Sequence, residues 1–366
     1  MSERVLTTAD LNRALLARQL LLERLKLSPT KALERIGGIQ AQYAPSSYIG
    51  LWSRLEGFAL ADLTKALERR RAVQGTLLRS TIHLVSAGDY WAFALGSRSA
   101  RQAGWLRFDK KRLSNAAMKA AANEVRAALA GRVAHRDELL ELARRRDPER
   151  PTHLWNGLSA WVELVRAPPS GTWERRRADL YALAEDWLDP PDASPREGAV
   201  LLLRRYLGGF GPAALADAAN WAGVPVAELE AAAEGLRLRR FHGEEGAELV
   251  DLQRAPLPDG STPAPVRFLP TWDATLLVHA RRTQILPEDF RPLVFATKTP
   301  QSTPTFLVDG AVAGKWKVER SAKKAALTVQ PFEKLSAGAK RDLRDEAERL
   351  VRFHEPEAES HRVSGI

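Results

Sequence analysis

The most informative part of the sequence is residues 194–252, SPREGAVLLLRRYLGGFGPAALADAANWAGVPVAELEAAAEGLRLRRFHGEEGAELVDL. Ser194 and Pro195 are typical of a helix start, and apolar residues at helical spacing predict a helix over 196–207, closed by Gly208-Gly209. A second helix is expected from Gly211-Pro212 to about residue 222, and a third over 226–235. Two short strands, 236–241 and 247–252, follow around a turn. Three helices and a hairpin in this order indicate a winged helix-turn-helix.

The same order of elements is expected twice more upstream. One copy has helices over 135–146 and 152–163 and a hairpin that turns at 168–171. The other has helices over 8–25, from Ser28-Pro29 and over 61–70, then strands over 73–78 and 81–85. After residue 266 strands dominate, at 266–269, 276–279, 293–296, 305–308 and 312–318, and a helix over 336–353 closes the chain.

The predicted fold class is therefore α+β and mainly helical, with three tandem winged helix-turn-helix units and a C-terminal β-rich domain with a closing helix. We place the first unit at 1–105, the second at 106–192, the third at 193–260 and the C-terminal domain at 261–366. A repressor normally obtains two DNA-reading units by dimerising, whereas tandem units let one chain curve around a duplex. We therefore expect a monomer.

Composition limits the chemistry of the chain. The 366 residues include 55 Lys and Arg, 45 Asp and Glu and no Cys, which excludes disulfides, thiolate nucleophiles, zinc fingers and iron–sulfur clusters. Residues 98–146 hold 13 basic and five acidic residues, which is +8 of the net charge of +10. This stretch is expected either to contact phosphates or to form a solvated arginine-rich face. The charged start and the lack of an apolar run of roughly 18 residues predict a cytoplasmic, nucleoid-associated protein without membrane contact.

Known catalytic motifs are missing from the sequence. It has no P-loop, no G-x-S-x-G, no H-E-x-x-H and no EF-hand loop. Residues 209–214 fit a loose dinucleotide fingerprint, but they lie in the winged-helix pattern where a turn between helices is expected. We therefore expect no nucleotide cofactor and no metal. Asp273 is either a catalytic carboxylate or, as is more usual at such a boundary, a backbone cap.

Two glutamines, Gln40 and Gln42, flank one alanine after the helix break at Gly37-Gly38. In an extended chain both amides point to the same side. An amide offers a donor and an acceptor but no charge, so it can orient a water or stabilise a cationic centre but cannot remove a proton. A surface polar pair without function is the alternative explanation.

The glutamine pair is one of several distinctive segments. They are 38–43 (GIQAQY), 51–54 (LWSR), 78–85 (LRSTIHLV), 171–174 (GTWE), 268–273 (FLPTWD), 308–310 (VDG) and 314–316 (GKW), together with Gly211-Pro212, Asp217 and Trp221. Together they resemble the AlkZ-type winged-helix DNA glycosylases, a family with a Gln-x-Gln signature, over nearly the whole chain. A housekeeping relative carries Gln-x-Asp instead, and the family often has Gly where Ser80 stands.

The resemblance implies a monofunctional DNA glycosylase that excises N7-alkylated purines from double-stranded DNA without metal or cofactor. In some members it extends to interstrand crosslinks, and the setting is base-excision repair or resistance to a genotoxin. An N7-alkylated purine is already cationic, so it leaves without a general acid through an oxocarbenium-like state. Neutral amides then suffice, with Gln42 orienting the water and Gln40 holding the water or the sugar.

The expected DNA-binding residues are Tyr43, Trp52, Arg54, Arg79, His83, Lys315, Trp316 and Lys317. The two arginines and His83 would hold phosphates near the lesion. Tyr43 and Trp52 would pack on the lesion or intercalate, unless they belong to the core. A hairpin over 313–318 would probe a groove or be an ordinary exposed hairpin.

Two other classes of protein fit the sequence. One is a non-catalytic winged-helix DNA-binding protein, a transcription regulator or lesion sensor in which the glutamines are structural. The other is a protein–protein scaffold, for which duplex affinity would not fall steeply with salt. A lysine nucleophile, from Lys110, Lys111, Lys315 or Lys317, would form a Schiff base that borohydride traps.

Overall fold

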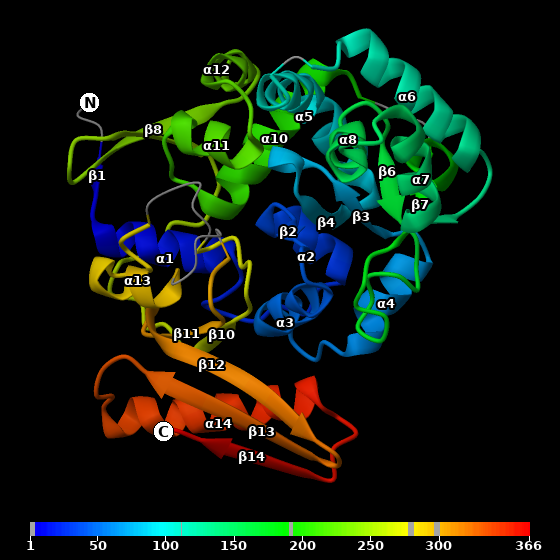
Figure 1. The fold of residues 1–366 in the computed structure, drawn as a ribbon. Helices are drawn as coiled ribbons and strands as arrows, with labels where there is room; N and C mark the ends of the chain where they lie inside the picture. Colours follow the sequence, from blue (N-terminus) through cyan, green and yellow to red (C-terminus); the bar gives the residue numbers. More distant parts are fainter. Residues whose placement is uncertain (1–3, 111, 190–192, 277–281, 296–300) are drawn as a thin grey trace.

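The computed structural model describes residues 4–110, 112–189, 193–276, 282–295 and 301–366. Figure 1 shows helices gathered around a central sheet, with the C-terminal strands and the helix α14 (Ala337–His354) along one edge of the molecule. The architecture is α+β and mainly helical, as predicted. None of the described helices is both long and apolar enough to cross a membrane.

The third unit has the predicted order of elements. It contains α10 (Pro195–Phe210), α11 (Leu215–Ala222), α12 (Val226–Ala233), β8 (Leu238–Gly243) and β9 (Glu248–Leu252), and β1 (Val5–Leu6) pairs parallel to β8. Ser194 caps α10 through the Glu197 amide, as the sequence indicates. Gly208-Gly209 does not end this helix. Instead Gly209 packs against α2 (Pro29–Ile36), where a Cβ atom would lie 2.8 Å from the carbonyl oxygen of Ile36.

The first and second units share one six-stranded sheet. Its order is β2 (Ile39–Gln40), β4 (Ile82–Ser86), β3 (Ala72–Thr76), β6 (Leu164–Arg166), β7 (Leu180–Leu183) and β5 (Ala134–His135). The two halves meet where Gly75 pairs with Val165. A Cβ atom at Gly75 would lie 2.6 Å from the Tyr90 ring, so the junction depends on glycine. The hairpins expected as separate wings are therefore one continuous sheet.

In chain order, the described helices of the first two units are α1 (Thr8–Arg18), α2, α3 (Ala44–Arg54), α4 (Leu60–Glu68), α5 (Ala87–Phe108), α6 (Asn115–Leu129), α7 (Arg136–Arg146), α8 (Pro151–Leu158) and α9 (Ala184–Trp187). The first helix was expected to reach residue 25, but α1 ends at Arg18, and the chain turns where Leu20 adopts a φ of 56°. Similarly, α8 ends at Leu158 instead of residue 163. Because α5 crosses residue 105, the predicted boundary there falls inside a helix; the domain division stays a prediction.

The C-terminal residues form a five-stranded sheet. Its order is β10 (Arg267–Leu269), β11 (Thr305–Val308), β12 (Ala311–Ser321), β13 (Lys324–Pro331) and β14 (Ser360–Ser364), of which β13 and β14 were not predicted. The strand expected over 293–296 is wrong for its described residues, because Leu293 and Val294 belong to α13 (Arg291–Val294), which has Pro292 in its first turn, and residue 296 lies outside the described part. Of the strand expected over 276–279, only Leu276 is described, and it lies in a turn. Two 3-10 segments are η1 (Leu78–Ser80) and η2 (Glu288–Phe290).

The C-terminal sheet and the first unit share a hydrophobic core. Phe268, Phe306 and Trp316 of the sheet belong to the same buried cluster as side chains from α2, α3 and α4. Leu343 and Leu350 of α14 belong to this cluster as well. The C-terminal domain is thus packed onto the first unit through an apolar interface, which favours one stable arrangement of the two parts.

Candidate functional site

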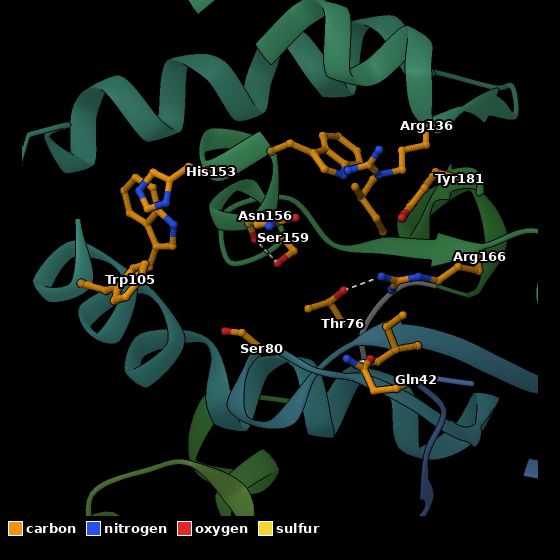
Figure 2. Close-up of a pocket in the computed structure, with 14 residues that line it drawn as sticks. Gln42, Thr76, Ser80, Trp105, Arg136, His153, Asn156, Ser159, Arg166 and Tyr181 are labelled. Carbon is orange, nitrogen blue, oxygen red and sulfur yellow. Dashed lines mark hydrogen bonds between the residues drawn. The ribbon is translucent and has the colours of Figure 1, made fainter. Parts of the chain in front are cut away.

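A cavity of about 420 Å³ lies between the strands of the first unit and helix α8 of the second unit. Figure 2 shows Gln42 and Ser80 on the side of the first unit, across from Asn156 and His153 of α8. The lining residues are Gln42, Thr76, Ser80, Ile82, Trp105, Phe108, Arg136, His153, Trp155, Asn156, Ser159, Leu164, Arg166 and Tyr181. None of these described residues is Asp or Glu, and two are arginines. The cavity therefore suits a ligand that carries negative charge.

The two glutamines of the predicted pair occupy different environments. Gln42 follows the end of β2, is exposed and lines the cavity, and its Oε1 accepts a hydrogen bond from the Ile82 amide at 3.0 Å. Gln40 lies on β2 and is only 6% exposed. It is not among the lining residues, and its Oε1 accepts a hydrogen bond from Arg79 Nη2 at 3.3 Å. Only Gln42 therefore faces the space that a ligand can enter.

Arg79 connects the first unit to the third. Its Nη1 donates to the carbonyl oxygen of Trp221 in α11, and its Nη2 donates to Gln40. Burial lowers the pKa of the Arg79 guanidinium to about 10. Arg79 and Ser80 have φ values of 52° and 57°, the left-handed region that residues other than glycine rarely adopt. These contacts hold Arg79 beside Gln40, behind the cavity.

His83 is buried next to this arginine. It pairs with Gln40 across β2 and β4, and its Nδ1 donates to the carbonyl oxygen of Thr81 at 3.1 Å. Burial, and then the positive charge of Arg79, lower the pKa of His83 to about 3. The ring is therefore neutral at physiological pH and does not offer the cation that the sequence analysis expected at a phosphate.

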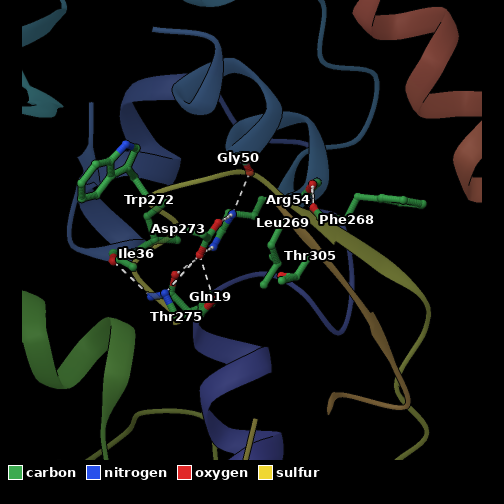
Figure 3. Close-up of polar contacts among 12 residues, drawn as sticks. Gln19, Ile36, Gly50, Arg54, Phe268, Leu269, Trp272, Asp273, Thr275 and Thr305 are labelled. Atoms are coloured by element: carbon green, nitrogen blue, oxygen red, sulfur yellow. Dashed lines mark hydrogen bonds and ion pairs between the residues drawn. The ribbon is translucent and has the colours of Figure 1, made fainter. Parts of the chain in front are cut away.

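Two other expected DNA contacts lie in the core. Arg54 is 2% exposed, and Figure 3 shows its guanidinium against the carboxylate of Asp273, with both Nη–Oδ distances at 2.9 Å. Burial opposes ionisation of Asp273, but Arg54 outweighs it and lowers the pKa of this carboxyl. Trp52 is buried and stacks on Phe353 of α14 at 5.6 Å. These contacts give all three residues structural partners, so we leave Arg54 and Trp52 out of the proposed DNA contacts and Asp273 out of the proposed catalytic residues.

Tyr43 remains available at the surface. Tyr43 is the residue just before α3 and is 43% exposed. Its hydroxyl accepts a hydrogen bond from Arg176 at 3.3 Å. Tyr43 follows Gln42 directly in the chain, although it does not itself line the cavity. Of the expected aromatic contacts, it is the one whose exposure suits a contact with DNA.

The expected C-terminal contacts lie inside one strand. Lys315, Trp316 and Lys317 belong to β12, and the turn of the β12–β13 hairpin is at residues 322–323, so residues 313–318 do not form a hairpin of their own. The Trp316 Nε1 donates to the carbonyl oxygens of Leu269 and Thr305, each at 3.0 Å, and the ring is buried. Lys317 pairs with Glu319. None of the three lines the cavity.

The basic stretch at 98–146 is partly neutralised within the protein. Its ion pairs are Arg98–Glu163, Arg101–Glu163, Arg126–Glu185, Arg132–Glu138, Arg144–Glu141 and Arg146–Glu124. No lysine is among the described residues that line the cavity, and Lys111 lies outside the described part of the chain. Among the residues that the structure describes, no group of three or more His, Asp or Glu side chains is placed to hold a metal ion.

The sequence analysis missed the contribution of the second unit to the cavity. His153 and Trp155 come from α8 and Tyr181 from β7 of this unit, while Trp105 comes from α5 at the border of the two units, and no local motif connects these three elements. The sequence around Arg166 contains a weak indication of a site, because this arginine follows an apolar pair at the end of a buried strand. A charge at such a position requires a partner or a ligand.

Comparison with known proteins gives two findings. The family model described as DNA glycosylase AlkZ-like matches residues 33–353. Among solved structures, the DNA glycosylase AlkZ of Streptomyces sahachiroi is similar, with a TM-score of 0.79 and 19% sequence identity, over 99% of this chain and 100% of that chain. At this identity the structural match indicates a shared fold. A search of the curated proteins finds no match.

Proposed function

The chain belongs to the AlkZ-like family of DNA glycosylases, and from this premise we propose that it hydrolyses the N-glycosidic bond of N7-alkylated purines in double-stranded DNA. The observation that carries this proposal is the exposed Gln42 amide in a cavity whose described lining contains no carboxylate. The described lining offers no carboxylate or lysine nucleophile, and its one histidine, His153, already bonds through Nε2 to the carboxylate of Asp109 at 2.8 Å. Such a site therefore suits a base that leaves without being protonated.

The chemistry of N7-alkylated purines meets this condition. The bond between N9 and C1′ breaks with its electron pair going to the cationic base, which leaves as a neutral molecule. The positive charge passes to the sugar as an oxocarbenium-like state. The oxygen of a water then bonds to C1′ and its proton goes to solvent, so no basic side chain is required.

In this mechanism Gln42 orients the attacking water. Its Oε1 already accepts one hydrogen bond, from Ile82, and a carbonyl oxygen can accept a second. The bond to Ile82 fixes the amide before the substrate arrives, which is how preorganised dipoles favour a transition state. Gln40 is the second member of the pair. Its hydrogen bond with Arg79 keeps a guanidinium beside β2, two residues before Gln42.

Larger lesions share the same leaving-group chemistry. A bulky N7 adduct or an N7-linked interstrand crosslink also carries the cationic purine that makes departure possible, so we include both in the proposed substrate class. The enzyme would be monofunctional and would act as a monomer without a cofactor. Its role would be base-excision repair or resistance to a genotoxin that alkylates N7.

The direct test of this activity is release of free 7-methylguanine from a duplex that carries one N7-methylguanine. We expect the protein to release the base and to leave an intact strand with an abasic site. Borohydride in the same reaction should trap no protein–DNA adduct, because a hydrolytic enzyme forms no Schiff base. A trapped adduct would replace the hydrolytic mechanism with a lysine nucleophile.

The non-catalytic alternative predicts a different pattern. A winged-helix binding protein would hold the same duplex with an affinity that falls steeply with salt, but it would release no base. Duplex affinity that is indifferent to salt, again without base release, would favour a protein–protein scaffold.

A further inference from the structure

Arg166 is a buried cation that lacks a counter-ion. Its side chain is at the end of β6 and is 7% exposed. Its Nη2 donates to Thr76 Oγ1 at 2.8 Å, but Nε and Nη1 have no hydrogen-bond partner within the described structure. These two nitrogens carry three N–H groups. The guanidinium lies 5.2 Å from the centre of the Tyr181 ring, which does not replace the missing acceptors.

Several other buried arginines of the described chain pair with a carboxylate, and Arg267, for which no ion pair is found, donates to the carbonyl oxygens of Val266 and Leu22. Arg18 holds both oxygens of the Asp251 carboxylate, and Arg54 does the same with Asp273. Arg101 pairs with Glu163 at 3.0 Å. Burial of an unpaired charge is unfavourable, so native structures normally supply a partner from the protein, a solvent molecule or a ligand. Among the described residues, none supplies a carboxylate to Arg166.

The position of Arg166 indicates a ligand. It lines the same cavity as Gln42, and Figure 2 shows its guanidinium directed from β6 to Thr76, on the side of the cavity where Gln42 lies. The described residues of this cavity include a second arginine and no carboxylate. An anionic oxygen in the cavity would therefore meet positive charge and unused N–H donors. In a DNA-binding protein that oxygen belongs to the phosphodiester backbone.

The protein holds Arg166 ready for such a contact. Thr76 fixes one Nη group, and the carbonyl oxygen of Thr76 in turn accepts a hydrogen bond from Arg101 Nη1 at 3.0 Å. The same Arg101 atom donates to the carbonyl oxygen of Ser159 at 2.7 Å. Arg101 thus connects the strand side of the cavity, at Thr76, to the α8 side, at Ser159.

We propose that Arg166 binds a backbone phosphate beside the nucleotide whose base is removed, and so holds that nucleotide next to Gln42. This role rests on the proposed function. It assigns to Arg166 the binding task that the sequence analysis gave to Arg54 and His83. Because the phosphate charge is the same before and during bond cleavage, the contact contributes mainly to substrate binding.

The test combines a protein variant with a change in the DNA. Each phosphate around the lesion is replaced in turn by an uncharged methylphosphonate, and Kd and the single-turnover rate of base release are measured for the parent and Arg166→Met. At one position the parent should lose about tenfold or more in affinity, whereas Arg166→Met should lose that factor on the unmodified duplex and nothing further on the modified one. Arg344→Met, at an exposed arginine of α14 outside the basic stretch, is the matched control and should follow the parent.

Other outcomes would overturn the inference. The affinity lost through Arg166→Met and the affinity lost through the methylphosphonate could instead multiply at every position. In that case Arg166 does not contact a phosphate. If Arg166→Met lowers the Tm without DNA while the pattern of phosphate dependence stays that of the parent, Arg166 is structural. Under our proposal removal of an unpaired buried charge leaves the Tm unchanged or raised. Arg166→Lys, which keeps the charge, should regain part of the affinity.

The failure of this inference can be told apart from the failure of the proposed function. If the parent releases no base from any N7-alkylated duplex, the proposed function is wrong, and Kd alone still reports the coupling between Arg166 and a phosphate. If the parent releases the base and the coupling is missing, only the role of Arg166 is wrong.

Discussion

Ser80 shows how one backbone angle connects a sequence pattern with the site. Its φ of 57° lies in the left-handed region, which glycine adopts without strain and other residues adopt at a cost of roughly 1–2 kcal/mol. The family resemblance described in the sequence analysis implies glycine at this position in many members, and this angle is one that glycine adopts most easily. Ser80 also lines the cavity. Ser80 therefore brings to the cavity a backbone conformation that glycine favours.

His83 makes a testable contribution to stability. Its pKa is lowered from 6.5 to about 3 in the folded protein, so below about pH 6.5 the unfolded chain takes up a proton that the folded protein does not. The free energy of unfolding therefore falls as the pH is lowered through the window from about 6.5 to 3. His83→Asn can keep a hydrogen-bond donor to Thr81. Between pH 7 and pH 5 we expect the free energy of unfolding of this variant to fall by about 2 kcal/mol less than that of the parent.

Denaturant unfolding of the parent and His83→Asn at several pH values measures this difference. Parallel pH profiles for the two proteins would contradict the neutral, buried state of His83.

The sequence analysis identified candidate site residues from local patterns, but it did not predict which of them are exposed. Gln42 was found from the Gln-x-Gln pattern, and the structure places it at a cavity. Arg54 and Trp316 belong to equally distinctive segments, yet Arg54 is buried against Asp273, 219 positions away, and Trp316 against Leu269 of β10, 47 positions away. Burial depends on these distant partners, which no local pattern contains. Arg166 was missed for the same reason, because its proposed role depends on the cavity that residues from other elements form around it.

At the level of elements, helices α5 and α10 cross at two glycines. A Cβ atom at Gly198 would lie 2.6 Å from the carbonyl oxygen of Ala92, and one at Gly96 would lie 2.7 Å from the backbone of Gly198. The two backbones can approach this closely only without side chains at the crossing. Together these helices carry much of the core shared by the first and third units.

Substitution at this crossing should separate packing from helix propensity. Gly198→Ala forces the two backbones apart, so we expect the free energy of unfolding to fall by about 1–3 kcal/mol. Gly104→Ala, on the partner helix α5 but away from the crossing, meets no atom within 4 Å and should raise the free energy of unfolding by about 0.5–1 kcal/mol. Thermal or denaturant unfolding distinguishes the two, and equal effects would contradict the close crossing.

Elements with local signals were predicted, and elements that depend on pairing were not. Ser194 and Gly223 mark helix ends by capping chemistry that acts within a few residues. In contrast, β14 pairs parallel to β13, and the sheet common to the first two units depends on the contact at Gly75. Neither pairing can be inferred from the residues of one strand. The short helix α13 was mistaken for a strand because a brief apolar run fits both.

At the scale of the whole molecule, one polar network ties three parts of the chain together. Arg54 of α3 pairs with Asp273 after β10 and donates to Gln19. Gln19 Nε2 in turn donates to the carbonyl oxygens of Ile36 and Gly209. Figure 3 shows Arg54 between Asp273 and Gln19. The network thus connects the first unit, the third unit and the C-terminal sheet.

Loss of one charge from this network should be costly. Asp273→Asn leaves the Arg54 guanidinium buried without its counter-ion, and we expect the free energy of unfolding to fall by about 3–5 kcal/mol. The double variant Arg54→Met with Asp273→Leu should recover part of this loss. Glu319→Gln, which breaks the exposed pair with Lys317, is the control and should change little. If Asp273→Asn unfolds like the parent, the network does not hold the parts together.

The most direct test of the whole account is the single-turnover release of 7-methylguanine by the parent, Gln42→Ala and Gln253→Ala at one salt concentration. Gln253 is an exposed glutamine in the turn after β9, so it controls for the chemistry of the substitution. We predict release by the parent and Gln253→Ala at equal rates, and a loss of about 10²-fold or more in Gln42→Ala with its Tm unchanged. A parent that is active and a Gln42→Ala variant that keeps the same rate would contradict the account.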